Sequence, residues 1–250
     1  MSAVQTTPIR PRHHPLFRTI AAALLGVVAG LLPAGAATIG TPTSQPATAE
    51  TGYALTSTTA VVRPVLRLGS KGTWVVTLQR RLAALRYDVG PIDGIFGSST
   101  HHGVVAFQKV NGLARDGIVG PITWAALDRP VVPRPRYWHS VYAVEVNLPK
   151  QVLYLTRQGA VVRILNASSG TASTPTPRGN FWVNRRIDGW RQSDLGLLWR
   201  PNYFYRGYAV HGSTSVPSYP ASHGCVRVTV AAMNRMWSIL RIGTPVHIYR

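Results

Sequence analysis

Cysteine and acidic residues are both scarce in this 250-residue chain. Cys225 is the single cysteine, so no disulfide can form within the chain. The chain has 8 Asp and Glu residues against 27 Lys and Arg residues, and no acid follows Asp194. A two-carboxylate glycosidase site or a carboxylate-rich metal site is therefore hard to assemble in the C-terminal part.

The formal net charge of +19 indicates an anionic partner, such as nucleic acid, a membrane surface or an acidic polymer. The chain has no recognised nucleic-acid motif and no basic helix interleaved with aromatic residues, so we expect no nucleic-acid partner. Only three of the 27 cations are lysines. An arginine-rich composition can also reflect genomic base bias.

The N-terminal segment has the pattern of a secretion signal. Three arginines precede an apolar run over residues 20–32, and the small residues 34–36 follow a proline. The run is short for a membrane span, which takes about 20 residues. We expect residues 1–36 to be a cleaved signal peptide, so that the exported chain has no stable membrane insertion; an uncleaved anchor is the alternative. Outside the cell a lone cysteine is either an intermolecular bridge or a reactive thiol.

Changes in composition divide the remaining chain into two linkers and two modules. Residues 37–64 are rich in Thr, Ser, Ala and Pro and lack apolar periodicity, which is typical of a flexible linker. Residues 65–128 are predicted to form a compact helical module. Residues 129–137 contain three prolines and are expected to form a stiff spacer. The second module takes residues 138–250.

The first module is predicted to be a small all-α, three-helix domain. Apolar residues recur at helical spacing over residues 71–86, and further helices are expected at 100–110 and 123–127.

An internal repeat lies between these helices. The pattern D-G-I-x-G-x-x-T starts at Asp93 and again 23 residues later at Asp116. In each copy Asp-Gly predicts a turn, and the threonine, Thr100 or Thr123, is expected to cap the next helix. We expect the two aspartates to hold these turns rather than to touch sugar.

The second module is predicted to be mainly β, with one helix behind the sheet. Short alternating segments predict strands at 142–146, 151–156, 161–165, 180–184, 207–211 and 245–249, the first two joined as a hairpin. One helix is predicted over residues 230–240, with Thr229 as its N-cap. The segment 188–205 carries five aromatic residues and is too irregular for one strand. It holds either core aromatics on loops or a lid over a site.

The chemistry of the second module is expected at Cys225. A thiol becomes a strong nucleophile as a thiolate, and a nearby imidazole can take its proton. His223 is two residues away, whereas His211 ends a separate predicted strand and could meet the sulfur face to face. We favour His211 as the base and give His223 a supporting role. No acid follows Asp194, so a backbone carbonyl, such as that of Gly212, is the expected orienting group.

Further residues around the cysteine are assigned supporting and substrate-binding roles. Gly224, with Ser222 beside it, lets another backbone approach and can present amide donors to an oxyanion. Arg227 could hold a substrate carboxylate, or it could be an ordinary surface arginine. Tyr208 is assigned to substrate binding. Too few acids and no spaced ligand motif argue against a zinc peptidase, and we expect neither metal nor cofactor.

The first module resembles the peptidoglycan-binding domain of the small three-helix type. Residues 68–72, 78–79 and 106–108 and both repeats carry the resemblance. It implies the fold more specifically than it implies any ligand contact.

The second module resembles L,D-transpeptidase catalytic domains of the YkuD type. His211-Gly212-Ser213 and the run S-H-G-C-V-R around Cys225 carry the resemblance, with support from residues 147–151, 176–179 and 243–246. It implies a β-rich fold, Cys225 as nucleophile, His211 as base and an oxyanion hole from amides near Gly224 and Cys225.

The resemblance also implies a reaction. The cysteine attacks the third residue of a peptidoglycan tetrapeptide stem, releases D-alanine and passes the acyl group to an amine of a neighbouring stem. Carbapenems would acylate the same thiol. The expected partner is peptidoglycan in the cell wall, and the expected state is a monomer.

Other functions remain open. With water as acceptor the site would be an L,D-carboxypeptidase, and without turnover the chain would be a wall-binding protein. A sortase also uses His, Cys and Arg in this order, but with a longer spacing from His to Cys. A papain-like peptidase places its cysteine before the base, which would force that role onto His247.

Overall fold

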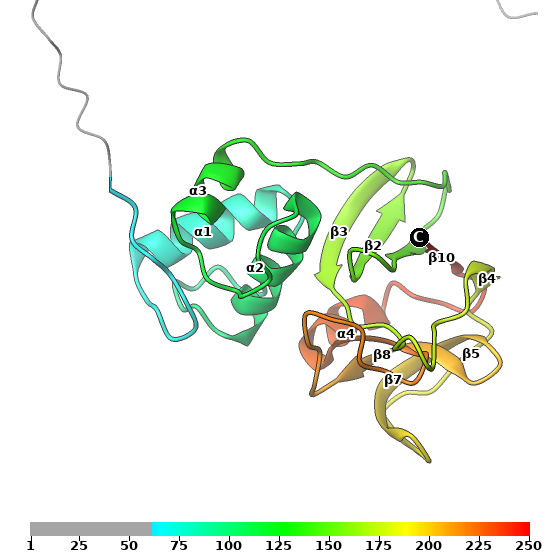
Figure 1. Ribbon diagram of the computed structural model, residues 1–250. Coiled ribbons are helices and arrows are strands. Elements are labelled where there is room, and N and C mark those ends of the chain that lie inside the picture. Colours follow the sequence, from blue (N-terminus) through cyan, green and yellow to red (C-terminus); the bar gives the residue numbers. More distant parts are fainter. Residues whose placement is uncertain (1–61) are drawn as a thin grey trace, which may run out of the picture. The chain divides into compact units, whose positions relative to one another are not determined.

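The computed structural model describes residues 62–250 (Figure 1). The expected signal peptide at 1–36, and the linker at 37–64 up to residue 61, lie outside the described residues. Within the described part, no helix has the length and apolar character needed to cross a membrane.

Three helices form the first module, which confirms the predicted fold class. They are α1 (Thr73–Ala84), α2 (Ser98–Asn111) and α3 (Pro121–Asp128). Apolar side chains from all three helices, including Leu78, Phe107 and Trp124, are buried in one core. The helical period of the sequence therefore identified the faces that α1 and α2 bury.

Each D-G-I turn is closed by a buried glutamine of the helix before it. Gln79 Nε2 donates to Asp93 Oδ1 at 2.9 Å, and Gln79 Oε1 accepts from the amide of Gly94 at 3.0 Å. Gln108 repeats this arrangement in the second copy, at 2.7 Å from Asp116 and 2.8 Å from the next amide. The aspartates hold the turns, as expected.

The prediction that the repeated threonines cap the helices is wrong. The N-cap residues are Gly97 and Gly120, and neither helix has a side-chain cap. Thr100 and Thr123 lie at the third helical position, where their hydroxyls accept from the glutamine amides at 3.0 and 3.4 Å. The buried glutamine needs this acceptor, so each threonine completes the turn instead of beginning the helix.

The second module contains two sheets, which corrects the expectation of one. In the first sheet the strand order is β3 (Ala160–Asn166), β2 (Val152–Arg157), β1 (Ala143–Asn147), β10 (Pro245–Tyr249) and β4 (Gly179–Trp182). In the second sheet the strand order is β5 (Arg185–Arg186), β7 (Gly196–Tyr205), β8 (Tyr208–Ser213) and β9 (Val226–Thr229). A further strand of this sheet, β6 (Trp190–Ser193), pairs with β7. Alternation marks strands along a chain but leaves their partners open, because pairing is non-local.

The two sheets and helix α4 (Val230–Trp237) bury a common core. Leu153 from the first sheet, Phe204 from the second and Met233 from the helix all belong to it. Thr229 Oγ1 accepts from the amide of Ala232 at 3.1 Å, so the predicted cap of this helix is confirmed. The mainly β fold with one helix is confirmed as well.

The aromatic segment 188–205 was expected to be too irregular for one strand, and it forms a hairpin of two strands rather than loops. Strand β6 pairs with the ten-residue strand β7, which bends through two register shifts. The shifts break the period-2 pattern and hide the strand from sequence reading.

The helical module packs directly on the first sheet. Helix α2 lies beside β3 in Figure 1, and Tyr154 and Ile164 of the β module share the core of the three helices. Arg235 of α4 donates two hydrogen bonds to Asp88, at 2.9 and 2.8 Å. The spacer at 129–137 is therefore only one of the connections between the modules.

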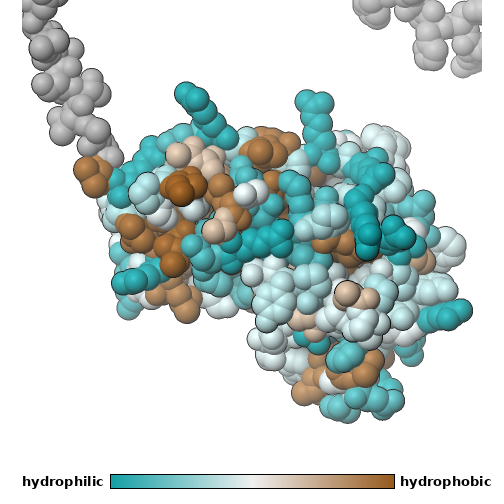
Figure 2. Space-filling model, viewed as in Figure 1, coloured by the Kyte–Doolittle hydropathy of each residue, from teal (hydrophilic) through white to brown (hydrophobic). Residues whose placement is uncertain are grey.

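Exposed apolar residues occur on both modules. Figure 2 shows brown surface over the helical module and at the tip of the β6–β7 hairpin. The exposed residues there include Leu68, Ile118 and Ile122 of the helical module and Leu195 and Leu197 of the hairpin.

Candidate active site

Parallel strands β8 and β9 bring the predicted catalytic residues to one face of the second sheet. His211 is the register partner of Arg227. Cys225 precedes β9 and is two positions from Arg227, so its side chain falls on the same face as His211. Residues 214–225, the nucleophile loop, join the two strands.

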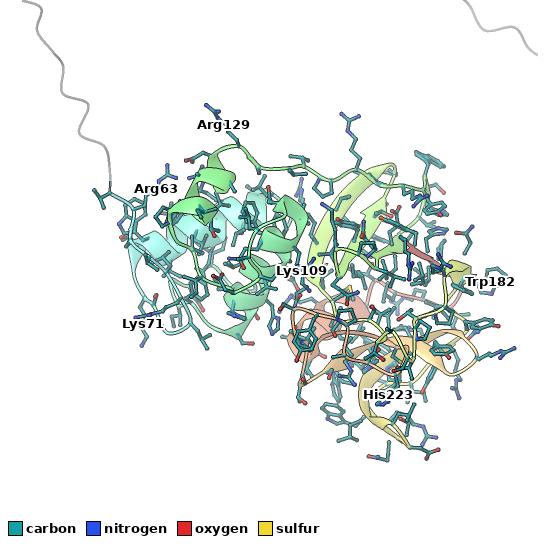
Figure 3. The ribbon with its side chains drawn as sticks, viewed as in Figure 1. Arg63, Lys71, Lys109, Arg129, Trp182 and His223 are labelled. Carbon is teal, nitrogen blue, oxygen red and sulfur yellow. The ribbon has the colours of Figure 1, made fainter. Side chains whose placement is uncertain are left out.

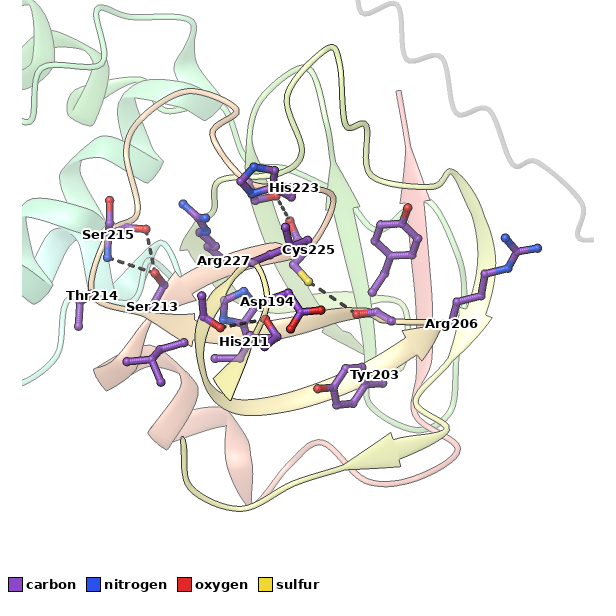
Figure 4. Close-up of a pocket in the computed structure, with 18 residues that line it drawn as sticks. Asp194, Tyr203, Arg206, His211, Ser213, Thr214, Ser215, His223, Cys225 and Arg227 are labelled. Atoms are coloured by element: carbon purple, nitrogen blue, oxygen red, sulfur yellow. Dashed lines mark hydrogen bonds between the residues drawn. The ribbon is translucent and has the colours of Figure 1, made fainter. Parts of the chain in front are cut away.

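This face opens into a pocket of about 610 Å³. Six of the eight residues predicted for the site line it: Tyr208, His211, Ser222, His223, Cys225 and Arg227 (Figure 4). The two glycines, Gly212 and Gly224, are not among the lining residues.

His211 is held in one tautomer. Its ring is 4% exposed, and Nδ1 lies 2.8 Å from the carbonyl oxygen of Gly212. A carbonyl only accepts, so Nδ1 carries the proton and Nε2 keeps a free lone pair. Burial, together with the nearby Arg227, lowers the pKa of His211 to about 4, although the hydrogen bond to Gly212 acts in the opposite direction. The imidazole is therefore neutral at neutral pH and has the form that a base requires.

The Cys225 thiol is half-buried and protonated at rest. Burial raises its pKa above the usual value. Its Sγ lies 4.0 Å from the carbonyl oxygen of Gly207, and among the described residues it makes no hydrogen bond to His211. Thiol and imidazole share the pocket as two neutral groups rather than as an ion pair.

The turn before Cys225 depends on Gly224. This residue has φ of +109°, and a Cβ built on it would lie 2.3 Å from Cε1 of Tyr208. Only glycine accommodates both the dihedral angle and the ring. Gly170 approaches the same point, since its Cβ would lie 2.9 Å from Cα of Gly224. Gly170 was missed, because its role arises from a contact between distant segments.

Ser222 fixes this turn and changes the expected role of Gly224. Its Oγ donates to the carbonyl oxygen of Cys225 at 2.5 Å and accepts from the amide of Gly224 at 3.1 Å. The Ser222 hydroxyl therefore occupies the amide of Gly224, one of the amides expected to serve an oxyanion.

His223 is exposed and lies apart from the thiol. In Figure 4 its ring points away from the sulfur of Cys225, while the ring of His211 lies on the sulfur's side. His247 takes no part in the pocket: it is 6% exposed and stacks between Tyr137 and His139.

Three charged side chains that line the pocket are available to a ligand. Arg227 was expected there, whereas Arg206 and Asp194 were missed. Within residues 62–250 none of the three makes a side-chain hydrogen bond or an ion pair. Arg206 lies in the turn before β8, and Asp194 lies at the tip of the β6–β7 hairpin. The hairpin tip thus forms a wall of the pocket, a role that the aromatic segment suggested.

Two family models match the chain. The model described as the L,D-transpeptidase catalytic domain, YkuD, matches residues 141–248. The model described as a putative peptidoglycan-binding domain matches residues 71–127.

A solved structure and two curated proteins are similar to this chain. The L,D-transpeptidase (residues 123–326) of Xylanimonas cellulosilytica is 48% identical over 75% of this chain and 98% of that chain, with a TM-score of 0.72. A protein in the bpoA1 3′ region of Kitasatospora aureofaciens is 39% identical over 43% of this chain and 84% of its own length. A spore cortex-lytic enzyme of Oceanobacillus iheyensis is 28% identical over 74% of this chain and 62% of its own length.

Proposed function

Because the chain belongs to the L,D-transpeptidase family and carries a peptidoglycan-binding module before its YkuD-type catalytic domain, we propose that it is an exported peptidoglycan L,D-transpeptidase. Cys225 attacks the carbonyl carbon of the third residue of a tetrapeptide stem and releases D-alanine. The acyl group then passes to a side-chain amine of a neighbouring stem and forms a 3–3 cross-link.

The state of His211 carries this proposal. The hydrogen bond from Nδ1 to Gly212 leaves Nε2 as the one nitrogen able to take a proton, and the ring shares its face of the sheet with Cys225. A neutral base beside a protonated thiol is the starting state for general-base catalysis of acyl transfer.

The first half-reaction uses that base and then returns its proton. As Sγ bonds to the stem carbonyl, the thiol proton moves to Nε2 of His211. The tetrahedral intermediate then breaks its bond to D-alanine, whose nitrogen takes the proton from His211. A thioester at Cys225 remains, and His211 is again neutral.

The second half-reaction mirrors the first. An amine of a neighbouring stem attacks the thioester carbon and gives a proton to His211. The carbon–sulfur bond breaks, the sulfur of Cys225 regains the proton, and an amide joins the two stems.

The opposed pKa shifts bear on the timing of proton transfer. Burial raises the pKa of the Cys225 thiol and lowers that of the His211 imidazole to about 4. A thiolate–imidazolium pair is therefore unfavourable before the sulfur attacks. We propose that the proton moves as the sulfur attacks, when charge passes from sulfur to the carbonyl oxygen.

Two kinds of pocket residue suit the proposed substrate. Arg227 and Arg206 can pair with stem carboxylates, and Tyr203 and Tyr208 provide aromatic walls. The Gly224 amide is occupied by Ser222, so the amide of Cys225 is the remaining candidate for the oxyanion donor.

The helical module is proposed to hold the enzyme on its polymer. A binding module linked to a catalytic domain raises the effective concentration of substrate at the pocket. The net charge of +19 suits an anionic cell wall.

Intact mass after meropenem treatment tests the proposed nucleophile. We expect one adduct on the wild-type protein, none on Cys225→Ala, and an adduct on His223→Ala, whose ring is exposed. Equal labelling of wild type and Cys225→Ala, or no labelling of either, would contradict the proposal.

Product analysis with tetrapeptide muropeptides separates transfer from hydrolysis. Dimeric muropeptides made by the wild type, and absent with Cys225→Ala, are the expected result. If only trimmed monomers form, the chain is an L,D-carboxypeptidase. If no product forms, the chain is a wall-binding protein without turnover.

A further inference from the structure

One lysine of the helical module is buried against the catalytic module. Lys109 of α2 is 2% exposed, and Figure 3 shows it between the helices and the strands, whereas Lys71 lies at the outer edge. Its Nζ donates to the carbonyl oxygens of Gln151 at 2.8 Å and Ala167 at 2.9 Å and to Oδ1 of Asn166. All three acceptors belong to the other module, and they use the three protons of an ammonium.

The contact with Asn166 leads directly to the nucleophile loop. Nζ of Lys109 can only donate, so Oδ1 of Asn166 must face it and the amide nitrogen must face away. That nitrogen donates to the carbonyl oxygen of Val216 at 3.2 Å and lies 2.8 Å from Nδ1 of His102. Lys109 therefore sets the direction of the amide that holds Val216.

A second path passes through residues 166–169, which we call the support segment. The side chain of Gln151 donates to Ser169 Oγ at 2.7 Å and accepts from the Ser169 amide at 2.8 Å. The carbonyl oxygen of Ser169 accepts from the amides of Ala221 and Ser222 at 2.9 and 3.0 Å. Ser222 in turn holds the carbonyl oxygen of Cys225.

Arg115 of the helical module also holds the nucleophile loop. Its guanidinium donates to the carbonyl oxygens of Ser218 and Pro149, each at 3.3 Å. The loop that carries the nucleophile is thus supported from the helical module directly by Arg115 and, through Asn166 and Ser169, by Lys109.

Burying the charge of Lys109 costs free energy, and among the described residues no carboxylate pairs with it to offset this cost. Among the described residues Lys109 has no carboxylate partner, and burial, with the nearby Arg115, lowers its pKa to about 7. An apolar side chain of similar length would fill this core without that penalty. The lysine contributes something that packing alone does not, namely three donors aimed at the support segment and Gln151.

We propose that Lys109 is a positioning residue for Cys225, acting through Asn166 and the support segment to fix the nucleophile loop. The helical module is then a structural part of the active site as well as a wall-binding module. The consequence for catalysis rests on the proposed function, whereas the consequence for the loop does not.

The test compares Lys109→Met with Lys71→Met in the full-length protein. Methionine is unbranched like lysine and is also a good helix former, but it has no hydrogen-bond donor. Lys71 serves as the control because it is an exposed lysine of the same module. Amide hydrogen exchange is measured for residues 214–228 and for α1 and α3. We expect exchange in 214–228 to be about tenfold faster in Lys109→Met, because three buried acceptors lose their donor. Exchange in α1 and α3, and in all of Lys71→Met, should match wild type.

Kinetics on soluble muropeptides provide a second readout. We expect Lys109→Met to lower kcat about tenfold with KM unchanged, since a displaced nucleophile affects the transition state rather than substrate capture. A purely structural role would leave kcat per folded molecule unchanged. If wild type shows no turnover, the proposed function fails, while the exchange result still decides the role of Lys109.

Asn166→Asp keeps the inference testable if Lys109→Met does not fold. The aspartate retains an acceptor for Lys109 but has no proton to donate to Val216. We expect faster exchange in 214–228 here as well. Unchanged exchange in 214–228 in folded Lys109→Met, or in Asn166→Asp when Lys109→Met does not fold, would overturn the proposal.

Discussion

The two modules treat their polar side chains in opposite ways. In the helical module, Gln79 and Gln108 use both atoms of their side-chain amides to close the repeated turns. In the β module, Arg227, Arg206 and Asp194 line a pocket, and within residues 62–250 their side chains make no hydrogen bond or ion pair. The first set stabilises a fold, whereas the second keeps its hydrogen-bonding capacity for a ligand.

This comparison separates two motifs that look alike in sequence. Both the D-G-I repeat and the S-H-G-C-V-R run combine a glycine with polar residues in or next to a short turn. In the repeat, every named polar group finds a partner nearby. In the run, the Ser222 hydroxyl is used by the turn, while the Cys225 thiol is left for chemistry, as is Nε2 of His211 on the neighbouring strand β8. The spare atoms, rather than the residue types, identify the site.

The largest expected effect comes from removing the proposed base, His211. Replacing His211 by Ala removes the free lone pair beside Cys225, and we expect acyl transfer to fall by about 10²–10⁴. His223→Ala is the control, because its exposed ring points away from the thiol, and it should retain near wild-type turnover. Single-turnover kinetics on muropeptides measure both. Full activity in His211→Ala would remove it as the base.

The second prediction concerns the position of the nucleophile rather than its chemistry. In Gly224→Ala the new methyl group would meet the ring of Tyr208, at a backbone angle that alanine disfavours. Displacing the nucleophile by about 1 Å lowers turnover by about 10². Gly207→Ala is the matched control, since it lines the same pocket and its Cβ would meet nothing within 4 Å. Equal activity of the two variants would contradict the steric argument.

The third prediction concerns pH. The pKa of His211 is about 4 in the folded chain, whereas the ordinary pKa of a histidine is 6.5. As the pH falls below 6.5, the unfolded chain therefore binds a proton at this residue more readily than the folded chain does. The contribution of the neutral His211 ring to the free energy of unfolding is complete above about pH 7 and decreases toward pH 4. At pH 5 the free energy of unfolding is lower by about 2 kcal/mol.

Urea denaturation at pH 7.5 and pH 5 measures this dependence. His211→Gln should lose less stability on acidification than wild type, whereas His223→Gln, changed at an exposed ring, should follow wild type. Only the pH dependence is compared, because the substitution also removes the hydrogen bond to Gly212. An unchanged dependence in His211→Gln would show that the ring is accessible to protons in the folded chain.

The smallest expected effect lies in the helical module. Gln79→Ala removes the hydrogen bonds to Asp93 and Gly94, which should lower the free energy of unfolding by about 1–3 kcal/mol. Acylation of Cys225 by meropenem should keep its wild-type rate, since Gln79 holds a turn and contacts nothing near the pocket. Gln192→Ala, at an exposed glutamine, is the stability control. A slower acylation in Gln79→Ala would erase the distinction between the modules.

Local patterns predicted the elements better than their ends and partners. The helical period located α1, α2, α3 and α4, and alternation located the strands of the first sheet. The strand β7 escaped because its bends break the alternation, and β9 escaped because it has only four residues. The repeated threonines were misassigned, because a capping pattern and a partner for a buried glutamine look the same along the chain.

The sequence by itself determined that one thiol, in a glycine-containing turn between two histidines and an arginine, is where chemistry is expected. It also determined the two modules, because period and repeat are properties of neighbouring residues. Only the tertiary structure decided which histidine shares a face with the sulfur, that Ser222 occupies the amide of Gly224, and that Lys109 reaches the support segment. Those outcomes depend on atoms brought together from distant segments, and no local spacing records them.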